Sequence, residues 1–432
     1  MDVAGAAELE ERAYRRVTIR LIPFLFLCYV VAYLDRVNVG FAKLQMLQDL
    51  GMSETAYGLG AGIFFIGYFF FEVPSNLMLH RVGARVWIAR IMITWGVLSA
   101  ATMFVTSAGW FYVVRFLLGI AEAGFFPGII LYLTQWYPAS RRARIVALFM
   151  TAVAISGVIG GPASGWILDR MAGVNGWAGW QWLFLLEGIP SLLMGVAVFF
   201  YLDDSIVSAP WLPEAERAVL VRNLAQETGG VEHGSVYETI RNAHVLLLSA
   251  VYFCIVMGLY GIGFWLPQLI RTMGVADAQR IGLLSAIPYG VAAIAMVVIG
   301  RSSDRRRERR WHLVSGTIAG AVGLAVAGLF STTLSVGLLA MCVATAGVLC
   351  AAPLFWTLPT AALRGASAAA GIAVINSIGN LAGFLSPYLI GVVRDVTGDA
   401  TFGLYVIAGF LLLGAALAMF ATRGPATAGQ TR

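Results

Sequence analysis

The sequence predicts an all-α polytopic membrane protein whose twelve transmembrane helices form two similar six-helix bundles. Three observations predict this fold: the composition, the recurrence of long apolar stretches and an internal repeat. Of the 432 residues, 59% are hydrophobic and only 12% are charged, and the mean hydropathy is +0.81. Soluble domains carry about 25% charged residues. We therefore expect the chain to lie in a lipid bilayer.

Twelve apolar stretches recur along the chain, and each is long enough for a helix that crosses a hydrocarbon core of about 30 Å. The even number of stretches puts both chain ends on the same side of the membrane. We predict spans at residues 18–41, 56–79, 85–106, 110–134, 143–168, 180–201, 243–270, 279–301, 310–331, 333–358, 366–393 and 400–421.

The basic residues lie mainly on one side of the predicted membrane, before the first span and after the second, fourth and eighth: Arg12, Arg15, Arg16, Arg20, Arg81, Arg85, Arg141, Arg142, Arg144 and the run 300–310. By the positive-inside rule both termini lie in the cytoplasm. The net charge of +6 therefore reflects topology, not binding of nucleic acid. Since no short apolar leader precedes the first span, we expect no removable signal peptide and a multi-pass protein of the cell (inner) membrane.

An acidic segment with two prolines separates the sixth and seventh spans. It divides the chain into an N-terminal bundle (1–201), a cytoplasmic linker (202–242) and a C-terminal bundle (243–432). The two bundles match each other in order at a nearly constant offset, as a duplicated unit should. The matching pairs are Phe41 and Phe264, Gly51 and Gly274, Gly58 and Gly282, Arg81 and Arg305, Pro138 and Pro359, and Gly165 and Gly391.

Three motifs resemble those of the major facilitator superfamily. NLMLHRVGAR (76–85) and GRSSDRRRERR (300–310) are similar to its loop signature, although His80 stands where an acidic residue is usual and Arg307 where a glycine is usual. SGVIGGPASGW (156–166) is similar to its glycine-proline signature of helix 5. The resemblance implies two bundles around a central cavity, alternating access, and gating loops that contain Arg81, Gly83, Arg85, Asp304 and Arg305.

The phrases YLDRVNVGFA, GYFFFEVPSN, RFLLGIAEAGFFPG and INSIGNLAGFLSPYLIG resemble the anion:cation symporter branch of that superfamily, and among its members the tartrate permeases most. This resemblance implies import of a small organic anion by a protein that functions as a monomer without a cofactor. It implies proton carriers at Asp35 and Glu122. It implies substrate-binding residues at Arg36, Arg115, Tyr33, Tyr68, Trp356 and Asn376.

The charged residues of the first and fourth spans also suggest a site on physical grounds. A charged side chain near the centre of a bilayer costs about 2.5–3.5 kcal/mol on insertion scales, so Asp35 and Arg36 are expected to have a use. Arg115 and Glu122 are seven residues apart, which returns them to one helix face about 10 Å apart. Guanidinium groups can hold a carboxylate through paired N–H donors. The alternative, that the four groups only neutralise one another as buried ion pairs, stays open.

The carboxylates fit a coupling role. A buried acid beside an arginine can change its protonation when an anion occupies that arginine. Moving an anion into a negative interior costs about 2.3 kcal/mol per charge per 100 mV, and two protons would offset this cost for a dicarboxylate. Protons are therefore the expected coupling ion.

Other polar residues fit structural roles. Glu72, Glu187 and Arg90 are expected near the cytoplasmic interface, where they can reach water. The cysteines fall inside apolar spans, where packing is expected rather than disulfides, and the four histidines have no metal-ligand spacing. The sequence lacks the motifs of common hydrolases and phosphate-binding enzymes, so we expect no enzyme. An exporter or exchanger of the same fold stays open, and a polytopic membrane enzyme is the remote alternative.

Overall fold

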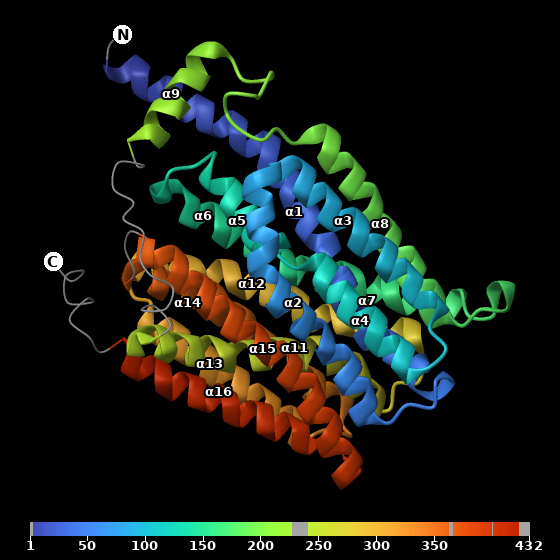
Figure 1. Cartoon of the computed structure of the whole chain (residues 1–432). Coiled ribbons are helices and arrows are strands. Elements are labelled where there is room, and N and C mark those ends of the chain that lie inside the picture. Colours follow the sequence, from blue (N-terminus) through green and yellow to red (C-terminus); the bar gives the residue numbers. More distant parts are fainter. Residues whose placement is uncertain (1–2, 227–240, 363–365, 400, 423–432) are drawn as a thin grey trace.

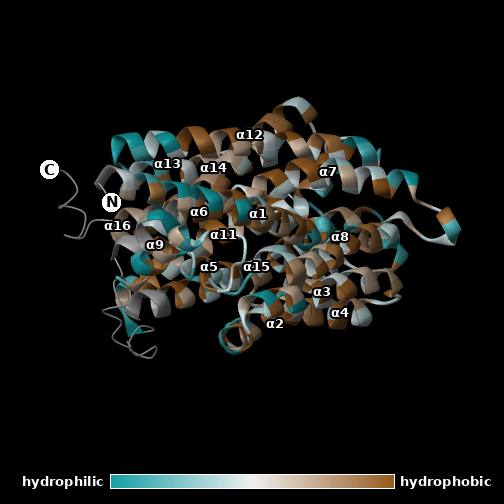
Figure 2. Cartoon of the chain, turned by 90° about the horizontal axis from the view of Figure 1, so that it is seen from above, coloured by the Kyte–Doolittle hydropathy of each residue, from teal (hydrophilic) through white to brown (hydrophobic). Residues whose placement is uncertain are grey.

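The computed structural model describes residues 3–226, 241–362, 366–399 and 401–422, and all regular elements in these ranges are helices (Figure 1). Twelve spans are long and apolar enough to cross a membrane, which agrees with the predicted number. Hydrophobic residues cover much of the length of helices such as α12 (Ala278–Arg306), α3 (Ala84–Ala101) and α4 (Ala108–Glu122) (Figure 2).

The first six spans are built from eight α-helices, because the fourth and fifth spans each contain a break. They are α1 (Val3–Asp49), α2 (Glu54–Val82), α3 (Ala84–Ala101) with the 3-10 turn η1 (Thr102–Phe104), α4 (Ala108–Glu122), α5 (Phe125–Thr134), α6 (Ala139–Met150), α7 (Ala152–Arg170) and, after the 3-10 turn η2 (Val174–Gly176), α8 (Gly179–Tyr201).

The last six spans are single helices. They are α11 (Ala243–Thr272), α12 (Ala278–Arg306), α13 (Arg310–Leu329), α14 (Leu334–Ala362), α15 (Ala366–Thr397) and α16 (Thr401–Ala421). An additional short helix, α9 (Glu214–Ala225), precedes them within the predicted linker.

The two halves repeat the same packing. In the first half α1 packs on α7 and α8, α2 on α4, and α3 on α8; in the second half α11 packs on α15 and α16, α12 on α14, and α13 on α16. The halves meet through α2 with α15 and through α7 with α12, which are again equivalent pairs. The predicted fold of two pseudo-symmetric six-helix bundles is confirmed (Figure 1).

The break in the fourth span places Glu122 at the last residue of α4. Gly124, which follows, has a φ of +85°, a conformation that glycine adopts at little cost. A Cβ atom there would also lie 2.4 Å from the Ser75 hydroxyl oxygen. The sequence predicted one continuous helix over 110–134. The glycine interrupts it, so that the chain turns directly after the carboxylate.

At Gly161, Gly165 and Gly282 the contact between α7 and α12 is made by backbone atoms, whereas Gly157 lies against the ring of Tyr289. A Cβ atom on Gly161 would lie 2.6 Å from the carbonyl oxygen of Gly282, and one on Gly282 would lie 2.2 Å from that of Gly161. Glycines let membrane helices approach this closely because no side chain separates them. The glycine-rich motif at 156–166 is therefore part of the surface on which the second half packs.

Helix α9 attaches the linker to the first turns of α1 (Figure 1). Glu216 is buried and its carboxylate pairs with Arg12, at 3.2 Å, and with Arg16, at 2.8 Å. Three of the acidic residues that defined the linker in the sequence, Glu227, Glu232 and Glu238, lie outside the described residues. The predicted boundaries 201–202 and 242–243 stay predictions.

Charged side chains join the two halves at the end of the bundle away from the termini. We call Lys43, Glu54, Trp265, Arg394 and Asp395 the far-end network. Glu54 pairs with Lys43 (2.5 Å) and with Arg394 (2.7 Å), and the Lys43 ammonium lies 3.2 Å from the centre of the Trp265 ring. The Asp395 carboxylate accepts hydrogen bonds from the backbone N–H groups of Glu54 (3.2 Å) and Thr55 (2.8 Å). These contacts connect α1 and α2 with α11 and α15.

We expect Glu54→Gln to lower the thermal unfolding midpoint of the purified protein in detergent. The substitution leaves the buried Lys43 ammonium without its carboxylate, and breaking a buried pair in this way costs up to about 3–5 kcal/mol. The double variant Lys43→Met/Glu54→Gln should recover part of the loss. Glu214→Gln, at an exposed position of α9, is the control. A midpoint for Glu54→Gln equal to that of the control would contradict a role of the network in joining the halves.

Candidate functional site

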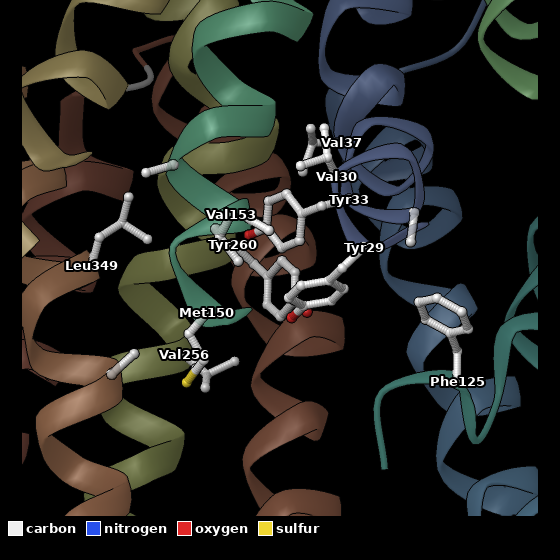
Figure 3. Packing of buried hydrophobic residues seen from close by; sticks show 14 of the residues in the cluster. Tyr29, Val30, Tyr33, Val37, Phe125, Met150, Val153, Val256, Tyr260 and Leu349 are labelled. Carbon is white, nitrogen blue, oxygen red and sulfur yellow. The ribbon is translucent and has the colours of Figure 1, made fainter. Parts of the chain in front are cut away.

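A cavity lies between the two halves. Among the described residues, its wall contains five tyrosines, two asparagines and a single charged residue, Arg36, beside apolar side chains. Tyr29, Tyr33 and Tyr260 lie together where α1 faces α11 (Figure 3). The wall thus combines aromatic surface with hydroxyl and amide groups. This composition suits a small polar molecule with a negative charge.

Arg36 connects three helices. One guanidinium nitrogen, Nη2, forms an ion pair with Glu122 at the end of α4. The other, Nη1, donates a hydrogen bond of 3.0 Å to the Tyr260 hydroxyl on α11. The guanidinium also lies 5.6 Å and 5.5 Å from the ring centres of Phe64 and Tyr68 on α2. Arg36 is therefore both a cavity wall residue and a contact between the two halves.

Asp35 points away from this cavity, although it is the neighbour of Arg36 in the chain. Its carboxylate accepts hydrogen bonds from Trp95 Nε1 (2.7 Å), Asn38 Nδ2 (3.1 Å), Ser191 Oγ (3.3 Å) and Ser99 Oγ. All of these donors belong to the first half. The sequence placed Asp35 and Arg36 in one constellation, but α1 presents them to different surroundings.

Arg115 is fully buried on α4 and does not belong to the cavity wall. Its Nη2 donates to the carbonyl oxygen of Ala61 (3.3 Å), and its guanidinium lies 5.0 Å from the ring centre of Phe64. Nε and Nη1 have no hydrogen-bond partner among the described residues. Both arginines therefore lie within 6 Å of the same ring. A direct contact of Arg115 with substrate stays a prediction.

Three of the four remaining residues that the sequence proposed for binding line the cavity: Tyr33, Tyr68 and Asn376. Trp356 lies behind this wall, where its ring packs edge-on against the ring of Tyr252 with 4.8 Å between centres. Its effect on a ligand would be transmitted through Tyr252, which is itself a wall residue.

Glu72 was expected near the cytoplasmic interface, and the structure corrects this expectation. It is 3% exposed, and its carboxylate accepts hydrogen bonds from Asn376 Nδ2 (2.6 Å) and Ser377 Oγ (3.3 Å) on α15. Glu187 is likewise 7% exposed in the interior of the first half. Both acids lie within apolar runs of the sequence, and this was the signal that could have placed them inside.

The first predicted gating loop is anchored within its own half. Gly83 has a φ of +96°, and a Cβ there would lie 2.8 Å from an Asp204 carboxylate oxygen. The backbone N–H of Arg85 donates to the same oxygen at 2.8 Å, while the side chain of Arg81 is exposed. The loop after α2 therefore binds the segment that follows α8. Its gating role stays a prediction.

The side chains of the second predicted gating loop bind other residues of the same loop. Asp304 pairs with Arg309, and Arg305 is exposed. Burial alone would raise the pKa of Glu308, but hydrogen bonds from the backbone and side chain of His312 and from the Trp311 backbone N–H (2.6 Å) outweigh it and lower that pKa. In the described residues no group of three His, Cys, Asp or Glu side chains could hold a metal ion.

The family model of the Major Facilitator Superfamily matches residues 25–387. The chain belongs to this superfamily. It is therefore a multi-pass membrane protein of a family of transporters, which agrees with the resemblance found in the sequence.

Three relatives align over nearly the whole chain. A Pseudomonas putida protein named "Putative metabolite transport protein NicT" is 52% identical over 93% of this chain and 92% of its own. An Agrobacterium vitis protein named "Putative tartrate transporter" is 50% identical over 98% and 94%. A "Quinolone resistance transporter" of Acinetobacter baumannii is 41% identical over 94% of each chain. These names differ in substrate, so they support the class of protein more than a particular ligand.

A similar solved structure is that of a bacterial homologue of the human lysosomal transporter Spinster in an inward-facing and occupied conformation. The two chains superpose with a TM-score of 0.74 over 95% of this chain and 97% of the other, at 17% sequence identity. At this level of identity the similarity establishes the fold alone.

We expect Tyr260→Phe to lower the thermal unfolding midpoint of this transporter. The substitution removes the hydroxyl that accepts from Arg36 across the two halves, and a hydrogen bond to a charged group contributes about 1.5–3 kcal/mol. Tyr289→Phe is the matched control, because Tyr289 is also a buried tyrosine of the second half and its hydroxyl has no hydrogen bond to another described residue. Equal midpoints for the two variants would contradict a stabilising role of the Arg36–Tyr260 contact.

Proposed function

We propose that this transporter imports a small organic carboxylate, such as tartrate, together with protons by alternating access. The observation that carries the proposal is the position of Arg36, which is the one charged side chain that the described residues place in the wall of the central cavity. The tartrate name of a relative at 50% identity supports the substrate class. In this proposal the protein lies in the inner membrane as a monomer with both termini in the cytoplasm.

Recognition of the anion would begin at Arg36. A carboxylate that enters the cavity meets a planar group of N–H donors, which can hold it through two parallel hydrogen bonds. Arg36 Nε has no hydrogen-bond partner among the described residues, so this donor is available without breaking a contact. The hydroxyl groups of Tyr29, Tyr33 and Tyr68 lie on the same wall. They can bind the remaining carboxylate and hydroxyl oxygens of the substrate.

Coupling to protons would arise from competition for the same guanidinium. Glu122 pairs with Arg36 in the described conformation. If a substrate carboxylate takes over this guanidinium, Glu122 loses its counter-charge in a buried place, and a buried carboxylate without a counter-charge binds a proton. Substrate and proton then bind together and leave together. A symporter requires this joint binding and release of substrate and proton.

The charge balance explains why more than one acid is needed. Each negative charge that moves into a negative interior costs about 2.3 kcal/mol per 100 mV. A dicarboxylate therefore needs two protons to travel without net charge. Glu122 beside Arg36 can supply one site, and Asp35, which is buried in the same half, can supply the second.

Export or exchange is a second candidate, favoured by the 41% identity to the quinolone resistance transporter. The two directions are separated by measuring transport in proteoliposomes with an imposed pH gradient. Labelled tartrate, a monocarboxylate of similar size and a quinolone are each offered to the protein. Accumulation of the dicarboxylate from the acidic side supports the proposal. Transport of the quinolone alone would overturn it.

We expect Arg36→Lys and Arg115→Lys each to weaken substrate binding by about tenfold to a hundredfold, although both keep the charge. A lysine ammonium cannot hold a carboxylate through two parallel N–H donors, and the loss of one charged hydrogen bond of about 1.5–3 kcal/mol corresponds to this range. Binding is measured on purified protein with tartrate. Arg301→Lys, at an exposed position, is the control. An unchanged affinity in Arg115→Lys would remove Arg115 from the site.

We expect Glu122→Gln to separate exchange from accumulation. The neutral amide resembles the protonated acid, so the variant should still exchange labelled for unlabelled substrate across the membrane. It should not concentrate substrate, because no proton leaves residue 122 to make the cycle directional. Counterflow and gradient-driven uptake are measured in the same liposomes. If Glu122→Gln accumulates substrate as the unmodified protein does, Glu122 is only a structural partner of Arg36.

A further inference from the structure

A second pair of buried acids lies inside the first half, away from Arg36. Asp35 and Asn38 are one turn apart on α1, and Glu187 and Ser191 are one turn apart on α8, so each pair occupies a single helix face. The two faces meet, since Ser191 Oγ donates to Asp35 (3.3 Å) and the Asn38 side chain lies beside Glu187. Asp35 and Glu187 are 2% and 7% exposed.

The hydrogen bonds around Asp35 are those of an ionised carboxylate. Four groups donate to its two oxygens, and one of them, the Trp95 indole N–H, can only donate. Asn38 contributes its Nδ2 to the same carboxylate. A carboxylate that accepts this many hydrogen bonds is stabilised in its charged form.

Glu187 is surrounded differently. Its Oε1 accepts a hydrogen bond of 2.6 Å from Ser164 Oγ. Its Oε2 and the Oδ1 of Asn38 are both buried acceptors without a partner among the described residues. Leaving two buried acceptors unsatisfied is costly. A proton on Glu187 Oε2 would neutralise this carboxylate and turn its unpartnered acceptor into a donor.

We propose that Asp35 and Glu187 form an acid pair that shares one proton, and that Glu187 holds this proton in the described conformation. The Asn38 amide N–H donates to Asp35, and the Asn38 side chain lies beside Glu187. Two buried carboxylates that act on each other electrostatically cannot both ionise cheaply. The pair therefore carries one negative charge, not two.

The surroundings of Glu187 contain no charge that would compete with this arrangement. Helix α8 packs against α1, α3, α7 and η1. In the described part of these elements the charged group that acts on Glu187 is Asp35, and Ser164 donates a hydrogen bond to it. Ser164 also lines a second cavity of about 340 Å³ between α7, α1 and the second half. Because Ser164 donates a hydrogen bond to Glu187, Glu187 lies one side chain away from this cavity.

The role of the pair in transport rests on the proposed proton coupling. An ionised Glu187 would make Asp35 retain a proton, because like charges repel. A neutral Glu187 lets Asp35 release its proton and take it up again in each cycle. Glu187 is thus a positioning residue that sets the proton affinity of Asp35.

The test is the carbonyl-stretch band of protonated carboxylic acids in the infrared spectrum of the purified protein, without substrate, at neutral pH. We expect Glu187→Gln to lose one component of this band. Glu122→Gln should keep that component, since Glu122 is ionised beside Arg36 in this conformation. Asp35→Asn should weaken the component, because Glu187 then loses the like charge that favours its protonated form. Folding of each variant is checked by its elution as a single species in size-exclusion chromatography, and Glu187→Asp, which keeps a carboxyl group, should restore the component.

If the spectra of Glu187→Gln and of the unmodified protein are identical, the proposal is wrong. A loss of the component on addition of Na⁺ would also overturn it, because the pair would then be a metal-cation site. None of these spectra requires substrate. A failure of gradient-driven uptake would therefore overturn the proposed symport and leave the acid pair standing, whereas an absent band would overturn the pair alone.

Discussion

A guanidinium in the middle of a membrane bundle needs a counter-charge, and Glu122 supplies it to Arg36. This ion pair fixes α1 against α4, while the hydrogen bond from Arg36 to Tyr260 fixes α1 against α11. The turn at Gly124 ends α4 directly after the carboxylate. The cavity wall, the contact between the two halves and the coupling that we propose therefore all depend on one buried pair. Anything that binds Arg36 changes all three together.

The buried acids differ in what surrounds them, and this difference is what allows them different tasks. Glu122 faces a cation. Asp35 is held by neutral donors of the first half. Glu72 receives its hydrogen bonds from α15 and so lies across the two halves. A carboxylate responds to the removal of its own partners. In the function that we propose, substrate acts on Glu122 through Arg36, whereas a movement of one half against the other would change the hydrogen bonds of Glu72.

The fold could be predicted from the sequence, because the length of the apolar stretches and the internal repeat can both be found in the sequence without knowledge of the packing. Arg36 could also be found, since an arginine in an apolar span is a strong signal. The sequence could not show that Asp35 faces the opposite way, because neighbouring residues on a helix point about 100° apart and only tertiary packing decides which one meets the cavity. Tyr260 gave no signal, since a tyrosine in an apolar helix is usual. Glu187 is an acid within an apolar run, and from the sequence we expected it near the membrane interface.

The contact of Gly161 with Gly282 has a mechanical consequence. Interlocked side chains oppose sliding, because each must leave its rotamer to let the other pass. Where backbone meets backbone without such side chains, two helices can shift along or around each other and keep their separation. The equivalent contact in the pseudo-symmetric arrangement is that of α2 with α15. We infer that the two bundles can slide on each other at the glycine contact with little resistance from side chains.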